Sequence, residues 1–201
     1  MGTALALGPA DHGRPLTPEE FTAARWQGGY WYELIHGRLY VLPAPGLPHD
    51  LLVQWLYRKL DGYSSRRPAV INYVSSRLRV FVHGVPEATR PEPDVAAFHD
   101  FPLHLPIGSY DWRDVSPVLV AEVVSEDDPD KDLVRNVGLY VLVPSIREYW
   151  VLDPRPDADR PTLLAHRRRG RRWQPVRTVP PGGVYTTPLL PGFALTIDPH
   201  R

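Results

Sequence analysis

The chain has 201 residues, with 23 basic and 23 acidic side chains, so its formal net charge is zero. This balance gives no field of one sign over the whole molecule, which would have indicated a strongly charged partner. The sequence has no cysteine, which excludes disulfides, thiolate nucleophiles and zinc sites built on cysteine, and which fits the reducing cytoplasm. A hydrophobic content of 43% is that of an ordinary soluble protein, and one domain is expected at this length.

The N-terminal region predicts an arm followed by a capped helix. We expect residues 1–15 to form a loose arm and residues 16–198 to form a single domain. The arm lacks the basic segment and long apolar run of a signal peptide, and no stretch predicts a membrane span. Thr17 is the predicted N-cap of a helix, with Glu20 completing a capping box. This helix should run to about Gln27, where two glycines end it.

The next segment predicts a hairpin, a helix and several strands. Strand patterns at 31–35 and 38–42 flank a tight turn at 36–37, whose histidine and glycine tolerate positive φ. Apolar residues at helical spacing then predict an amphipathic helix over 48–63, with His49 in its first turn. Short strands are expected at Val70–Val74, Leu78–Val82 and Asp94–Phe98.

A strand–helix–strand unit is predicted over residues 117–153. Its first strand is too apolar to face water, yet Glu122 stands within it. A polar turn leads into a helical pattern that ends at Pro144, and a second strand covers 148–152. An unpaired buried charge is costly, so the Glu122 carboxylate must be neutralised, paired or used to hold a metal.

The C-terminal region predicts a hairpin with a charged tip. Strands at 162–168 and 171–179 flank Gly170, and a further short strand is expected near 193–197. Arginines crowd this tip just before Trp173, and two interpretations stay open for them. The tip is either a solvated turn or a phosphate-binding element with a tryptophan available for stacking.

Three strand carboxylates carry the functional hypothesis. Glu33, Asp94 and Glu122 each lie in, or at the edge of, a strand with apolar neighbours. Acids brought together by strands of one sheet would form an oxygen-rich site suited to Mg²⁺ or Mn²⁺. Such a site can activate water and stabilise charge at a phosphodiester. Each carboxylate alone is more often a structural ion pair, so the prediction rests on the set.

Short motifs follow one another along most of the chain, in an order and spacing that are more specific than any single motif. They are Tyr32-Glu33-Leu34-Ile35-x-Gly37, Pro43-x-Pro45 followed by His49, Pro93-Asp94-Val95-Ala96, Val120-x-Glu122-Val123-Val124-Ser125, a helix ending in Tyr140, and Glu148-Tyr149-Trp150-Val151-Leu152-Asp153.

This series, over about residues 17–155, resembles the Uma-two family of restriction-endonuclease-like proteins, within the PD-(D/E)XK nuclease-like superfamily. The resemblance implies an α/β fold with a mixed central sheet flanked by helices, an N-terminal helix and hairpin, and a C-terminal hairpin. It also implies a nuclease that acts on DNA, often as a homodimer. In that family pattern Asp94 and Glu122 are ligands of Mg²⁺ or Mn²⁺, Glu33 is a supporting acid, and His49 lies near the mouth of the site.

One position departs from the family pattern. The family has a lysine four residues before the tyrosine of the helix, where this chain has Asn136. An amide can hydrogen-bond a water or a phosphate, but it supplies no positive charge. Arg135 lies about 100° away around the helix, and Lys131 reaches the site only if the preceding turn is irregular. Asp132, beside Lys131, either favours the helix start or orders a loop beside the metal.

Two functions therefore stay open, beside a third hypothesis of a purely structural dimer with no salt-dependent DNA binding. The first is a metal-dependent nuclease with an atypical site, in which Asn136 stands among the catalytic residues and Arg135 or Lys131 supports it. The alternative is a non-catalytic module on the same fold that binds nucleic acid or protein.

Overall fold

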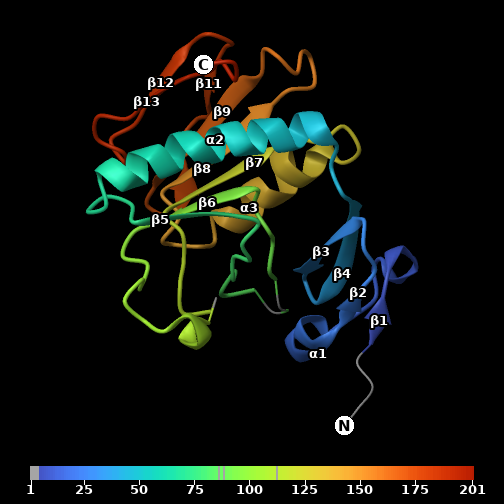
Figure 1. Cartoon of the computed structure of the whole chain (residues 1–201). Coiled ribbons are helices and arrows are strands. Elements are labelled where there is room, and N and C mark those ends of the chain that lie inside the picture. The colour runs from blue at the N-terminus through green and yellow to red at the C-terminus, as the bar shows by residue number, and fades with distance from the viewer. Residues whose placement is uncertain (1–4, 86, 88, 112) are drawn as a thin grey trace.

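The computed structural model describes residues 5–85, 87, 89–111 and 113–201, and a mixed sheet forms its centre (Figure 1). The strand order is β10-β9-β8-β7-β6-β5, with β11 paired to β9. Within this sheet β7 and β8 are the described pair that runs in parallel, and the helical segment between them makes the crossover that this requires. The strands are β5 (Tyr73–Ser76), β6 (Val95–Phe98), β7 (Leu119–Val123), β8 (Glu148–Asp153), β9 (Thr162–Arg169), β10 (Arg172–Trp173) and β11 (Arg177–Val179).

Helices cover both faces of this sheet, which confirms the predicted architecture (Figure 1). The long helix α2 (Leu47–Arg66) lies over one face. The π-helix η3 (Lys131–Arg135) and helix α3 (Asn136–Tyr140) lie over the other. Side chains of a strand alternate between faces, so Ala121 and Val123 pack toward α2 while Glu122 points toward α3.

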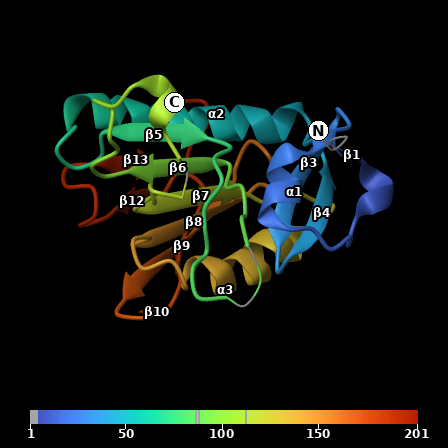
Figure 2. The same ribbon diagram turned by 90° about the horizontal axis from the view of Figure 1, so that it is seen from below.

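The N-terminal residues form a separate layer beside the ends of the sheet strands (Figure 2). Strands β3 (Tyr30–Ile35) and β4 (Arg38–Pro43) make the predicted hairpin, and His36 and Gly37 have φ of 49° and 66° in its turn. Helix α1 (Pro18–Ala23) packs on this hairpin through Phe21. Its capping box between Thr17 and Glu20 forms as predicted.

Two expectations for this layer are wrong. Helix α1 ends at Ala23 instead of Gln27, because β2 (Arg25–Trp26) pairs in parallel with β1 (Ala6–Leu7). The described part of the expected loose arm is packed, since Leu7 and Leu16 are buried and the 3-10 helix η1 (Pro9–Asp11) lies between them. Residues 1–4 lie outside the described residues.

The segment 78–82 is not the predicted strand, although its alternating side chains are buried as expected. Val80 and Val82 donate backbone hydrogen bonds to Pro91 and Thr89, and these contacts replace a regular ladder. The neighbouring strand β5 begins at Tyr73, three residues later than Val70.

The C-terminal region has the predicted hairpin, and the expected last strand is β13 (Ala194–Thr196). It pairs with β12 (Val184–Thr186), which the sequence did not predict. A further 3-10 helix, η2 (Ile107–Ser109), stands in the long loop before β7. Among the described helices, none combines the length and apolar character that crossing a bilayer requires.

Candidate active site

Two of the predicted acids lie side by side at the centre of the sheet. Asp94 immediately precedes β6, and Glu122 lies on the neighbouring antiparallel strand β7. The backbone N–H of Asp94 donates to Glu122 Oε2 at 3.2 Å, and the N–H of Val123 donates to Asp94 Oδ2 at 2.8 Å. Both carboxylates are buried, so the sheet itself brings together the acid pair that the sequence predicted.

Glu122 accepts further hydrogen bonds from the helical layer. The Tyr140 hydroxyl and the Asn136 amide both donate to Glu122 Oε1, each at 2.9 Å. Oε2 faces the ammonium of Lys131, at 3.6 Å. Burial raises the pKa of the Glu122 carboxyl well above its usual range, and the negative charges of Asp132 and Asp94 add to this against the opposing effect of Lys131.

The turn before α3 is irregular, and this irregularity lets the Lys131 side chain reach Glu122. Segment η3 is π-helical, and the N–H of Asn136 donates to the carbonyl of Lys131, five residues earlier. A π-turn therefore brings residues five apart onto one face, as an α-turn does for residues four apart. Lys131 and Asn136 thus both face Glu122, and the Lys131 ammonium also pairs with Asp132.

Asp132 belongs to the same buried cluster. Burial raises the pKa of its carboxyl to about 6, although the charge of Lys131 opposes that shift. Burial would lower the pKa of Lys131, but the carboxylates of Glu122 and Asp132 raise it, so the ammonium stays charged. Asp132 thus anchors the lysine, and the amide of Asn136 also contacts Asp132 Oδ1, at 3.3 Å.

Glu33 joins the cluster from the hairpin and not from the central sheet, so the expectation of three acids on one sheet is wrong for this residue. Its carboxylate pairs with the guanidinium of Arg135 and accepts the N–H of Glu92 at 3.0 Å. Arg135 also donates to the Asn136 side-chain oxygen, at 3.1 Å. Glu33 therefore touches the amide of Asn136 only through Arg135.

His49 closes the side of the cluster that faces α2. Its Nε2 lies 3.3 Å from Asp94 Oδ2 and 3.0 Å from the carbonyl oxygen of Val123. Burial disfavours the imidazolium, but the hydrogen bond and charge of Asp94 outweigh burial and raise the pKa of His49. A cavity of about 40 Å³ adjoins His49, Asp94 and Lys131. That volume is close to the roughly 30 Å³ that one water occupies in the liquid.

The residues present fit a hard divalent cation. In the described residues of the cluster, four buried carboxylates (Glu33, Asp94, Glu122 and Asp132) face two permanent cations (Lys131 and Arg135) and His49. With all four ionised, the carboxylates outnumber the two permanent cations, and the raised pKa of Glu122 means that a divalent cation would bind there in exchange for a proton. No three His, Cys, Asp or Glu side chains of the described residues form a ready cage. Mg²⁺ needs none, because it commonly binds through one or two carboxylates and keeps several waters.

Arg168 and Trp173, on either side of the C-terminal hairpin tip, pack on α3, whereas Arg169, Arg171 and Arg172 at the tip itself are exposed. The indole N–H of Trp173 donates to the carbonyl of Val137 at 2.9 Å, and the Arg168 guanidinium lies over the ring. Arg168 also donates to backbone carbonyls at the end of α3, including that of Val143 at 2.8 Å. Trp173 is therefore engaged by α3. The pairing of Arg167 with Glu148 places the tip at the opposite end of the strands from Glu122.

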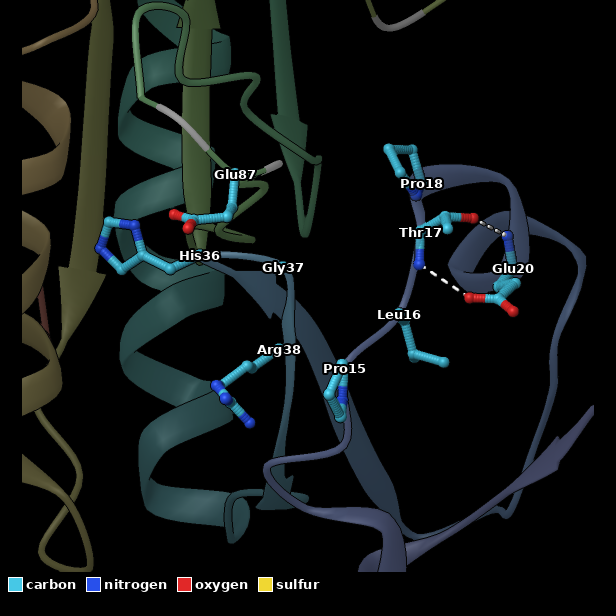
Figure 3. Close-up of a pocket in the computed structure, with 9 residues that line it drawn as sticks. All are labelled: Pro15, Leu16, Thr17, Pro18, Glu20, His36, Gly37, Arg38 and Glu87. Carbon is cyan, nitrogen blue, oxygen red and sulfur yellow. Dashed lines mark hydrogen bonds between the residues drawn. The ribbon is translucent and has the colours of Figure 1, made fainter.

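A larger hollow, of about 500 Å³, lies between the segment before α1 and the turn of the β3–β4 hairpin (Figure 3). Thr17 and Glu20, at its edge, bond to one another in the capping box. None of the predicted acids lines it, so this hollow is separate from the acid cluster.

Sequence reasoning missed two buried carboxylate networks. The Tyr140 hydroxyl bonds to Glu122, and the spacing of four residues from Asn136 was the available signal. Glu148 is buried on β8 and accepts from Trp150, Tyr185 and Thr187. Three donors from within the fold satisfy Glu148, so it is a structural carboxylate.

The comparisons with known proteins agree with this fold. The Uma2 family model, described as "Putative restriction endonuclease", matches residues 18–198. The crystal structure of "a putative nuclease belonging to DUF820 from Anabaena variabilis" superposes with a TM-score of 0.64 at 16% identity. The match covers 91% of this chain and 96% of that one. No curated protein matches the chain significantly. At this identity the structural likeness shows the mixed α/β fold alone.

Proposed function

Because the chain belongs to the Uma2 family, we propose that its Asp94–Glu122 site hydrolyses phosphodiester bonds of DNA with Mg²⁺ or Mn²⁺. The observation that carries this proposal is that two buried carboxylates, Asp94 just before β6 and Glu122 on β7, lie side by side and each accept a backbone N–H from the other's segment. A bound divalent ion would supply Lewis acidity at the phosphate and a water of lowered pKa.

The residues of the chain divide this work. Asp94 and Glu122 would hold the ion, and the carbonyl of Val123 is a further oxygen beside Asp94. Lys131, on the wall of the small cavity, offers a positive charge to a phosphate oxygen as negative charge develops there. Asn136 and Tyr140 orient Glu122, and Asn136 is therefore a positioning residue in this proposal.

The test is nicking of supercoiled plasmid by the purified protein in Mn²⁺ or Mg²⁺. We expect cleavage by the wild type and a loss of about 100-fold or more in Asp94→Asn and in Lys131→Met, as for the removal of a group that stabilises transition-state charge. Asp159→Asn is the matched control, because Asp159 is exposed and forms its ion pair with His200, which is not a member of the cluster. Wild-type protein that cuts no DNA in either metal contradicts the proposal.

The alternative, a non-catalytic binding module, is favoured by the number of contacts that the two acids already make. Asp94 and Glu122 accept hydrogen bonds from the chain itself, and His49 and Lys131 lie against them. This alternative predicts equal DNA binding by the wild type and Asp94→Asn, with no cleavage by either. The homodimer and the cytoplasmic location stay predictions that sedimentation and cell fractionation test.

A further inference from the structure

A second cavity, of about 400 Å³, opens beside Asp94. It shares Trp31, His49 and Asp94 with the small cavity of the acid cluster, so the two are neighbours. Its walls carry charges of both signs. Arg77 and Asp50 line this cavity but not the small one. The volume lies within the range of sites that bind small molecules or parts of larger ones.

Arg77 is placed against this cavity by two contacts. Its guanidinium carbon lies 4.1 Å from the centre of the Trp31 ring. Its backbone N–H points to the carbonyl of Asp94, at 3.3 Å. Arg77 is exposed, and no ion pair among the described residues involves it. The Glu92 carboxylate feels the charge of Arg77 but forms its ion pair with Arg79, so among the described residues Arg77 stands next to Asp94 without an ion pair of its own.

The backbone of Arg77 is in the left-handed region, with φ of 58°. This conformation is unfavourable for a non-glycine residue, and such outliers gather at functional sites. The Trp31 ring holds the guanidinium in place from one side, and no hydrogen bond of the described residues occupies its N–H donors. A planar fork of that kind matches the paired oxygens of a phosphate.

We propose that Arg77, held on Trp31, binds a phosphate of the nucleic acid strand that flanks the phosphodiester at Asp94. The proposal rests on the proposed function for the identity of the bond at Asp94. The carboxylate of Asp94 on the wall of this cavity repels a polyanionic strand, so the strand needs a cation at its approach. Arg77 supplies that cation, whereas Asp50 in the same cavity opposes the strand.

The test measures binding without cleavage. All variants carry Asp94→Asn, and anisotropy of a fluorescein-labelled single-stranded oligonucleotide is followed in EDTA over a range of salt. Arg77→Gln is expected to weaken binding about fivefold to tenfold at 50 mM salt and to reduce the slope of log K against log salt by about 0.7, the value for one phosphate contact with a single strand. Asp50→Asn is expected to strengthen binding.

Two further variants keep the result decisive. Arg77→Gly removes the side chain at a position where positive φ suits glycine, so a loss of binding there is no folding defect. Arg58→Gln is the matched control, because Arg58 is an exposed arginine on α2 that lines neither cavity. Its binding should equal that of the parent.

Unchanged affinity and unchanged salt slope in Arg77→Gln and Arg77→Gly overturn the proposal, as does a parent protein that binds no strand. Strand binding that depends on Arg77, in a protein whose wild type cuts no DNA, would leave the subsite in place and contradict the proposed hydrolysis alone.

Discussion

At the scale of single residues, Asn136 and Lys131 together explain how the cluster is charged. Asn136 is fully buried and bonds to Glu122, Asp132 and Arg135. Its amide satisfies those groups and adds no charge. Lys131 supplies the cation from the face that the π-turn gives it. Asn136, which departs from the family pattern in sequence, therefore links Glu122, Asp132 and Arg135 by hydrogen bonds in the fold.

Asn136→Lys tests that interpretation. A lysine here must fit a fully buried place and put a second ammonium beside Lys131, so we expect it to destabilise the fold by about 1–3 kcal/mol. It should not raise plasmid nicking. The double variant Lys131→Met/Asn136→Lys keeps the number of cations, so it should lose less stability than the two single changes add up to. Urea unfolding of the four proteins measures this, and a single variant that gains both stability and activity refutes it.

Tyr140→Phe removes one donor from a buried carboxylate. The hydroxyl bonds to Glu122 Oε1 inside the core, so its loss leaves that oxygen with one neutral donor fewer. We expect a cost of about 1–3 kcal/mol, measured by chemical denaturation. Tyr63→Phe is the control, because its hydroxyl donates to a backbone carbonyl in a partly buried place and its loss should cost less. Equal costs for the two variants would show that Glu122 gains nothing special from Tyr140.

At the scale of elements, one ion pair joins the hairpin to the helical layer. Glu33 on β3 pairs with Arg135 in η3, and both side chains are largely buried. The N–H of Glu92, just before β6, donates to the same carboxylate. This contact brings three segments that are distant in sequence to one point beside the acid cluster.

A double-mutant cycle measures that link. Glu33→Gln leaves the buried Arg135 charge without its carboxylate, and Arg135→Gln leaves the buried Glu33 charge without its guanidinium. Each change should therefore lower the free energy of unfolding by roughly 3 kcal/mol or more. The double variant removes both charges and should cost less than the sum, which gives a favourable coupling energy. Denaturant unfolding supplies the four values. Additive costs would mean that the Glu33–Arg135 ion pair does not couple the hairpin to the helical layer.

Sequence reasoning reached the parts of the fold that local patterns determine. The capping box at Thr17 and the turn at His36 and Gly37 formed as predicted, because their chemistry is local. The acid pair was also predictable, since a carboxylate inside an apolar strand is exceptional. The π-turn was not, because it depends on how Lys131 and Asp132 pack against Glu122. The strand prediction for residues 78–82 was wrong because buried and half-buried side chains alternate there without the backbone hydrogen bonds of a strand ladder.

At the scale of the whole molecule, the site should couple metal binding to stability. An ion that binds only the folded chain stabilises it by mass action, by about 2.7 kcal/mol when its concentration is 100 times its Kd. We therefore expect Mn²⁺ to raise the Tm of the wild type in a thermal melt. Asp94→Asn should remove most of this rise, and the control Asp159→Asn should keep it. An equal rise in all three proteins would place the ion elsewhere.

The most direct measurement is an anomalous difference map from crystals soaked in Mn²⁺. The account predicts one strong peak in contact with the carboxylates of Asp94 and Glu122. A peak at another place, or a site that stays closed by His49 and Lys131 at saturating Mn²⁺, would contradict it.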